Sequence, residues 1–486
     1  MINLILDPHA RELATKLDGL PLALATAGAY LSQVSTSLAD YLRYYNSSWL
    51  RLQETSPELS SYEDALYSTW NISYKHIHSR NESAGKLLQL WAYFDNQDLW
   101  YALLAGGSKC SPEWFSTIID DELNFNEAIR LLCDHALIES HGVSGGYGMH
   151  SCVHAWIMHV LNSERDTPMA KLALNCVSSA IPDETVFEYW ALQRRLLPHA
   201  NRCLELVYDA SIFDLENSDY ILDAAHKLGI LYSDQGKMKE AEEMYLRALA
   251  GYEKTWGSEH TSTLNTVNNL GALYSDQGKM KEAEEMYLRA LTGYEKAWGP
   301  EHTLTLDTVN NLGLLYSNQG KMKEAEEMYL RALTGYEKAW SPEHTSTLRT
   351  VNNLGLLYKN QGKRKEAEEM YLRALTGYEK AWSPEHTLTL NTVNNLGALY
   401  SDQGKMKEAE EMYLRALAGY EKVWGPENKR SLDTTYNLAV MYKERLMFRD
   451  AAKHFELVVQ GYTKILGPEH SETVEALDQW KGCKGK

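Results

Sequence analysis

The chain has 486 residues, which is too long for a single compact core, so two or more structural regions are expected. Its formal net charge of −18 argues against nucleic acid as a partner, because phosphates need an excess of lysine and arginine on the binding face. No apolar run approaches the roughly 20 residues that span a bilayer, and the start lacks the basic and apolar pattern of a signal peptide. We therefore expect a cytoplasmic protein.

The first third of the chain predicts short helices. Helices are expected near Pro8–Lys16 and Pro21–Val34, since proline in the first turn of a helix gives up no needed hydrogen bond. Further helical stretches are expected near Tyr62–Ile77 and Ser83–Phe94. The segment Leu131–Ile157 predicts a helix, a short hairpin through LIESHG and GYGMH, and a second helix. This order predicts a winged-helix-like domain, and a helical bridge is expected after it.

Beyond about residue 218 the sequence repeats with a fixed period. Tyrosine recurs every 42 residues, at Tyr232, Tyr274, Tyr316, Tyr358, Tyr400 and Tyr442. Such a period indicates a solenoid, in which each unit buries its apolar face only against its neighbours. The array should present a long concave surface, which favours binding over catalysis. The last unit is atypical, because Leu446 replaces a turn glycine and Leu466 replaces a tryptophan.

Each repeat predicts two antiparallel helices, for instance 264–277 and 281–298. Gly278 between them suits a left-handed turn. Pro300 marks the end of the second helix, and Thr303 or Thr305 is expected to cap the next one. Capping and loop packing are also expected of the histidines in the EHT and EHS turns, namely His260, His302, His344, His386 and His470.

Small and aromatic residues indicate how the two helices pack. Tyr274, Tyr287 and Trp298 are expected to fill the spaces between helices. Gly293 lies inside a helix, where glycine costs about 1 kcal/mol relative to alanine, so close packing is expected there. The order of seven residues in the unit resembles the characteristic order of the tetratricopeptide repeat (TPR): Leu270, Gly271, Tyr274, Gly278, Ala283, Tyr287 and Ala290. The resemblance covers roughly residues 220–467 and implies an all-α solenoid, and the 42-residue unit is similar to that of kinesin light chains.

One side of the first helix varies between copies. On a wheel of about 100° per residue, Val267, Leu270 and Tyr274 gather on the core side. Residues 265, 268, 269, 272, 275 and 276 gather on the opposite side, and most changes between copies fall there, at 265, 272, 275 and 276. The outer residues stay constant in the four central copies, as Lys281, Glu284, Glu285 and Lys296 show. This pattern indicates an adaptable binding groove, and the alternative is free drift of solvent-facing positions.

Asparagines recur within the same stripe. They are Asn268, Asn269, Asn310, Asn311, Asn352, Asn353, Asn394, Asn395 and Asn437. An amide side chain both donates and accepts hydrogen bonds, so such a row predicts pairing with the backbone of an extended peptide. The alternative is a ladder of amides that bond each other between adjacent helices. Arg349, Lys359 and Arg364 make the fourth unit basic and predict a ligand with an acidic residue near it.

The first third resembles another family. The motif GLPL within Leu17–Leu31 resembles the end of NB-ARC nucleotide-switch domains, and Met149–Trp156 resembles their MHD-type motif. The span Leu87–Trp100 is similar to fungal NLR-like receptors. By this resemblance Pro21 would lie against an adenine and His150 near a phosphate. The MHD-type motif departs from the family, because alanine stands where its aspartate is expected.

The chain lacks the GxxxxGK[ST] loop that cradles phosphates. We therefore interpret Pro21 and His150 as structural relics and the chain as a truncated relative or an incomplete gene model. No catalytic motif or cofactor is predicted. His150 and His154 are spaced like a metal pair, but no further ligands complete a set. The expected regions are an NB-ARC remnant (1–60), a winged-helix-like domain (61–165), a bridge (166–217), about six repeats (218–467) and a C-terminal cap (468–486).

The sequence thus predicts a non-enzymatic protein-interaction scaffold that binds an extended peptide and derives from an NLR-like receptor. A cargo adaptor like kinesin light chain is one alternative, although residues 1–165 lack the heptads of a coiled coil. A nucleotide-dependent switch of the STAND type, with its P-loop in missing upstream sequence, is the other.

Overall fold

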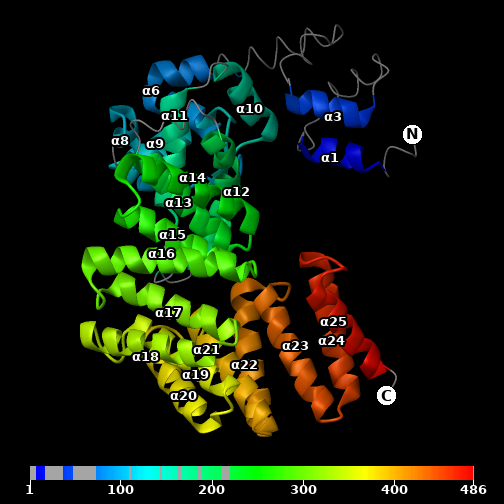
Figure 1. Cartoon of the computed structure of the whole chain (residues 1–486). Helices are drawn as coiled ribbons and strands as arrows, with labels where there is room; N and C mark the ends of the chain where they lie inside the picture. Colours follow the sequence, from blue (N-terminus) through cyan, green and yellow to red (C-terminus); the bar gives the residue numbers. More distant parts are fainter. Residues whose placement is uncertain are drawn as a thin grey trace. The chain divides into compact units, whose positions relative to one another are not determined.

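The computed structural model describes residues 7–16, 37–47, 70, 73–108, 111–142, 145–162, 166–182, 186, 189–208 and 219–484. In these ranges the protein is mainly helical, as predicted, with one two-stranded sheet (Figure 1). The chain divides into two compact units, residues 1–251 and 252–486. No described helix combines the length and the apolar character that crossing a membrane would require.

The first unit begins with short helices and a hairpin. Its elements before the repeats are α1 (Pro8–Lys16), α3 (Leu38–Ser47), α6 (Glu82–Trp91), α7 (Tyr101–Ala105), η2 (Gly106–Ser108), α8 (Glu113–Ile119), α9 (Glu122–Asp134), β1 (Glu139–His141), β2 (Gly146–Gly148), α10 (Ser151–Trp156), η3 (Ile157–Leu161), α11 (Thr167–Ser179) and α12 (Tyr189–Tyr208). The predicted helix Pro8–Lys16 is confirmed by α1, and that near Ser83–Phe94 by α6. The helix predicted at Pro21–Val34 lies outside the described residues, as does most of Tyr62–Ile77.

The predicted hairpin is confirmed. β1 and β2 pair antiparallel with Ser140 opposite Tyr147, and Tyr147 also forms a bridge with Leu99. Beside Leu99, both carboxylate oxygens of Asp98 accept hydrogen bonds from Arg195 of α12, from Nε and Nη2, at 2.7 Å each. This two-point ion pair fixes the hairpin region to the helix that leads into the repeats.

The repeats are antiparallel helix pairs. In chain order they are α13 (Asp219–Asp234) with α14 (Met238–Trp256), α15 (Thr261–Asp276) with α16 (Met280–Trp298), α17 (Thr303–Asn318) with α18 (Met322–Ala339), α19 (Thr345–Asn360) with α20 (Arg364–Ala381), α21 (Thr387–Asp402) with α22 (Met406–Trp424), and α23 (Lys429–Glu444) with α24 (Phe448–Ile465). A last helix, α25 (Ser471–Lys484), packs on α24. We call the members of each pair the first helix and the second helix.

Glycines set the distance within a pair. A Cβ built on Gly293 would lie 2.6 Å from Leu264 Cδ2, and one on Gly271 would lie 2.8 Å from the Tyr287 ring. The close packing predicted at Gly293 is therefore confirmed. Neither contact leaves room for a methyl group, so the helix-propensity cost of glycine is offset by the approach of the two helices.

Each pair also buries its core against the next. Leu312 and Leu315 of α17 form one buried cluster with Ala283 and Tyr287 of α16. The equivalent clusters recur along the array. This arrangement is the nearest-neighbour burial that the period of 42 residues predicts.

The turn between the two helices is left-handed, as predicted. Gly278 has φ +75°, and the Lys279 amide donates to the Tyr274 carbonyl oxygen at 2.8 Å, which closes the helix end. In the last pair Leu446 takes the same place with φ +61°. A leucine in this conformation crowds its own backbone, because its Cβ approaches the following carbonyl oxygen.

Histidine, and not threonine, caps the first helices. His302 Nδ1 accepts the Leu304 amide at 3.3 Å, so the prediction that Thr303 or Thr305 caps α17 is wrong. Thr305 instead donates from Oγ1 to the Gly299 carbonyl oxygen at 2.8 Å. The capping expected of the turn histidines is confirmed, and the same bond is made by His260, His344, His386 and His470.

Trp298 does not fill a space between helices, contrary to the prediction. Its side chain is 52% exposed and stacks on His302, with ring centroids 5.0 Å apart. Tyr287 is buried as predicted. Trp298 is the last residue of α16, so its side chain reaches the capping turn rather than the core.

We expect Leu446→Gly to stabilise the protein. The side chain is 73% exposed, so little packing is lost, while relief of the left-handed strain is worth about 1 kcal/mol. The free energy of unfolding, measured in guanidinium chloride, should rise. The reverse change at the matched position, Gly404→Leu (φ +75° in the present protein), should lower it by a similar amount. Changes of equal sign in the two variants would contradict the strain argument.

We expect the His344 cap to weaken on acidification. Its Nδ1 accepts the Ser346 amide at 3.2 Å only while unprotonated. Burial lowers the pKa of His344, so its folded-state pKa lies below the value of about 6.5 found in unfolded chains. Its stabilisation is therefore complete above that unfolded value and lost as pH falls through the folded value. The loss should be about 1 kcal/mol, the worth of an N-cap, in unfolding measured near neutral and near pH 5.

The chain supplies the control for this prediction. In α23 the cap is Asn428, whose Oδ1 accepts the Arg430 amide at 2.9 Å, and asparagine does not titrate. His344→Asn should therefore match the wild type near neutral pH and lose less stability on acidification. If both proteins lose the same amount, the cap does not carry the pH dependence.

Candidate peptide-binding surface

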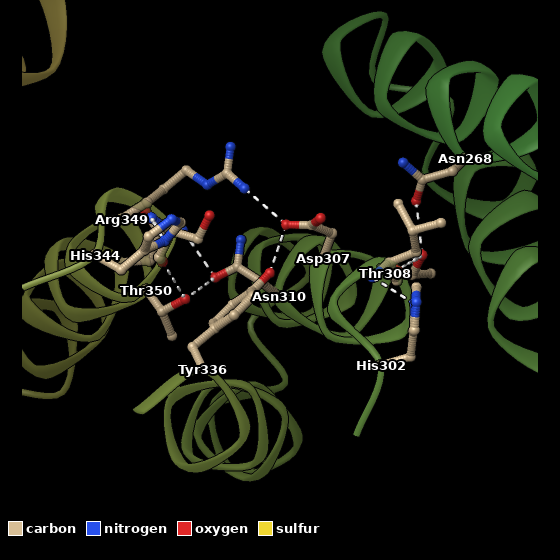
Figure 2. A network of polar contacts seen from close by, with 12 residues as sticks. Asn268, His302, Asp307, Thr308, Asn310, Tyr336, His344, Arg349 and Thr350 are labelled. Carbon is tan, nitrogen blue, oxygen red and sulfur yellow. Dashed lines mark hydrogen bonds and ion pairs between the residues drawn. The ribbon is translucent and has the colours of Figure 1, made fainter. Parts of the chain in front are cut away.

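The first helices α15, α17, α19, α21 and α23 form one continuous face. Neighbouring first helices contact each other directly and lie closer together than neighbouring second helices do. The array is therefore narrower on this side, which is the inner side of its curvature. We call it the first-helix face, and Figure 2 shows part of it in α15, α17 and α19. All the asparagines predicted to bind a peptide belong to these helices.

Each first helix from α15 to α21 carries two adjacent asparagines, and the first of the two forms a hydrogen bond with the next repeat. Thr350 Oγ1 of α19 donates to Asn310 Oδ1 of α17 at 3.1 Å (Figure 2). Asn310 is only 2% exposed, so this bond is shielded from water. The same bond at 3.1 Å joins Thr308 to Asn268 and Thr392 to Asn352.

The second asparagine of each pair extends the contact. Asn353 Nδ2 donates to Asn310 Oδ1 at 3.4 Å, and Asn395 Nδ2 donates to Asn352 Oδ1 at the same distance. Asn437 reaches Asn394 at 3.5 Å. The amides therefore form the ladder that the sequence left open as an alternative. In Asn353 and Asn395 the ladder uses one amide hydrogen, and the carbonyl oxygen lies outside these bonds.

The first variable position of the stripe, residue 265 and its equivalents, accepts a hydrogen bond from the second helix of its own repeat in several of the copies. Tyr336 donates from its hydroxyl to Asp307 Oδ1 at 2.5 Å, and Tyr420 does the same to Asn391. Burial raises the pKa of Tyr336 well above its usual value, and the Asp307 carboxylate adds to this, so the hydroxyl stays a donor. Between these two repeats the variation at this position therefore exchanges one acceptor, Asp307, for another, Asn391.

Two of the three predicted cations, Arg349 and Lys359, are ion-paired inside the array. Arg349 replaces the acceptor in α19, and its Nη2 lies 2.9 Å from Asp307 Oδ1 of the preceding repeat (Figure 2). Lys359 Nζ lies 3.3 Å from Asp402 Oδ2 of the next repeat. An acidic ligand would have to displace a carboxylate from either residue, so the fourth unit does not present two unpaired cations to a ligand.

The constant outer residues are partly explained by contacts between repeats. Glu284 accepts from Gln319 at 3.1 Å and lies 3.3 Å from Lys321. Lys296 pairs with Glu259 at 2.6 Å. Of the four constant residues, only Lys281 and Glu285 are exposed without one of these contacts. The argument that exposed positions outside the stripe stay constant therefore rests on two positions and not on four.

A second column on the first-helix face also varies between repeats, and its side chains are apolar. It contains Ala272, Leu314, Leu356, Ala398 and Val440. Leu314 is 37% exposed, whereas the other four pack partly against buried clusters. Together with the second asparagines, this column gives the face an amide row beside an apolar row. Comparison of the copies already identifies this column, since alanine at residue 272 changes to leucine in the two middle repeats.

Of the two residues predicted as nucleotide relics, only His150 belongs to the described chain. Pro21 lies outside the described residues. His150 caps α10, with its Nδ1 accepting the Cys152 amide at 3.2 Å. His154 is half-buried with Nε2 3.1 Å from the Phe94 carbonyl oxygen, and desolvation of its ring lowers its pKa to about 4. No group of three or more potential metal ligands occurs in the described ranges.

Comparison with known protein families identifies the repeats. The tetratricopeptide repeat family matches residues 220–296, 263–338, 303–380, 346–422 and 431–472, together about half of the chain. A nucleotide-binding leucine-rich repeat (NLR)-like protein of Hyaloscypha variabilis is 28% identical over 279 residues, which cover 54% of this chain and 26% of that protein. The chain thus spans about a quarter of the length of the curated relative it matches.

Two solved structures are among those similar to the chain. A kinesin light chain-type protein of Podosopora anserina with nearly identical TPR-like repeats is 27% identical, with a TM-score of 0.35 over 41% of this chain and 95% of that one. A STAND protein of Pyrococcus horikoshii with a tetratricopeptide repeat sensor is 14% identical, with a TM-score of 0.44 over 94% of this chain and 72% of that one. With its helix pairs, left-handed glycine turns and family match in agreement, the chain belongs to the tetratricopeptide repeat proteins.

Proposed function

We propose that the first-helix face binds an extended segment of a partner protein. The observation that carries this proposal is the amide row beside the apolar row. Asn353 and Asn395 each use one amide hydrogen in the ladder, and their carbonyl oxygens can accept a hydrogen bond from a ligand. The row repeats once per helix pair, so a peptide backbone lying across the helices would meet one amide in each repeat.

The spacing of the face suits an extended chain. Packed helices lie about 8–10 Å apart, and an extended peptide advances about 3.3 Å per residue. A ligand would therefore advance by about three residues per repeat, with backbone groups on the amides and side chains on the column around Leu314. The proposed activity is binding alone, without a catalytic step.

We further infer that this surface is the ligand-sensing part of an NLR-like protein. The similarity to the Hyaloscypha variabilis protein supports this. In such a protein, capture of a partner by the array would act on the region that precedes it. The cargo-adaptor alternative draws no comparable support from a feature of residues 1–165.

We expect loss of peptide binding when the second asparagines are truncated. A library of random 12-residue peptides displayed on phage would be selected on the full chain, and the enriched peptides measured by calorimetry. The variant Asn311→Ala, Asn353→Ala, Asn395→Ala should weaken them at least about tenfold, since each lost bond is worth about 0.5–1.5 kcal/mol.

The matched control lies on the second helices. Replacing Lys281, Lys323 and Lys365 with alanine changes three repeats on the exposed outer side and should leave affinity unchanged. The proposal fails if no peptide is enriched, or if the enriched peptides bind the first-helix variant as tightly as the wild type.

The two asparagines of one pair should differ in their effect on stability. Asn310→Ala removes a buried acceptor and leaves Asn353 without its acceptor, so the free energy of unfolding should fall by about 1–3 kcal/mol. Asn311→Ala should change it by less than about 0.5 kcal/mol. Chemical unfolding of both variants measures this, and equal losses would contradict the division of roles.

A further inference from the structure

A cavity outside the repeats lies within the first unit, where α6, α8, α11 and α13 meet. Its volume is about 530 Å³, within the range of about 300–1,000 Å³ typical of small-molecule sites. The wall combines apolar residues, aromatic residues and lysines, including Trp114, Met169, Leu172, Tyr220, Lys86 and Lys171. Nothing in the proposed peptide binding uses this cavity.

The two lysines differ in their partners. Lys86 Nζ lies 2.6 Å from Glu82 Oε1 and 6.0 Å from the centroid of the Trp114 ring, so its charge is balanced and its place is fixed. Lys171 is half-buried and has no ion pair with any residue that the structure describes. Lys171 therefore brings to the cavity wall a charge that no ion pair within the described chain compensates.

The carboxylate of the wall does not balance Lys171. Asp166 is the N-cap of α11, and its Oδ1 accepts the Met169 amide at 3.0 Å. That bond holds the carboxylate at the helix end, where it compensates the positive end of the helix dipole. A cation beside apolar walls favours an anion from outside, because the attraction is stronger where water is excluded.

The aromatic side chains of the wall indicate that the anion carries an aromatic ring. Trp114 is partly buried, and Tyr220 is 41% exposed in the same wall. Aromatic rings pack favourably edge to face or offset against another ring, beyond the area they bury. Met169 and Leu172 complete an apolar floor that excludes a highly polar ligand.

We propose that this cavity binds a small aromatic carboxylate, with its carboxylate on Lys171 Nζ and its ring against Trp114 and Tyr220. The site is independent of the first-helix face. It gives the first unit a small-molecule ligand of its own, next to the helix α13 with which the repeats begin.

The test uses a matched pair of probes, indole-3-acetate and the neutral indole-3-acetamide. Isothermal titration of the full chain should show that the carboxylate binds at least tenfold more tightly than the amide. Lys171→Met keeps the length and apolar stem of the side chain but removes its charge, so this preference should disappear. Lys171→Arg should keep it, and Lys239→Met, at an exposed lysine outside the cavity, should leave it unchanged.

Thermal unfolding of each variant verifies that the fold is retained. The proposal is overturned if indole-3-acetate binds no more tightly than indole-3-acetamide, or if Lys171→Met retains the tenfold preference. Loss of the preference in Lys239→Met to the same extent would also overturn it, since the effect would then reflect net charge alone.

Discussion

The close approach of two helices within each pair is the constraint on which the rest of the array depends. A Cβ at Gly271 or Gly293 would overlap the facing Tyr287 ring or Leu264 side chain. With the helices this close, the remaining apolar residues must be buried by the next pair, as Leu312 and Leu315 are against α16. Stability is therefore assembled from neighbour to neighbour, and a position can vary freely only where no neighbour touches it.

The first-helix face combines packing between adjacent repeats with the proposed recognition of a ligand. Burial of Asn310 and its bond to Thr350 tie adjacent repeats together, so the first asparagine of each pair serves the fold. The second asparagine contributes to the ladder only through one long bond and remains partly exposed. Structure and recognition can share the amide row because an amide has two donor hydrogens and an acceptor oxygen.

Variation along the face is compensated where it meets a neighbour. When arginine replaces an acceptor at Arg349, it turns to Asp307, which then accepts from both Arg349 and Tyr336. The alanine-to-leucine change at Leu314 has no such compensation, since the side chain stays 37% exposed. That difference separates substitutions that adjust packing from those that change what the surface can bind.

Much of the fold followed from the sequence alone. The 42-residue period, the turn at Gly278 and the need for glycine at Gly293 are local properties, so the helix pairs and their close packing could be predicted before any coordinates. The cap was misassigned because threonine and histidine both stand near the helix start, and the choice depends on a difference of one residue in where the helix begins. Trp298 was misplaced because the side chain of a residue at a helix end can point either into the core or toward the loop that follows the helix.

Only the tertiary structure decided which polar side chains are partnered. Arg349 and Asp307, like Thr350 and Asn310, are about 40 residues apart in sequence, and their contact depends on the spacing and crossing angle of adjacent helices. Neither quantity can be derived from periodicity. The sequence by itself therefore determined the repeat, its two helices and its exposed stripe, whereas the packing of one repeat on the next determined which part of that stripe is left for a ligand.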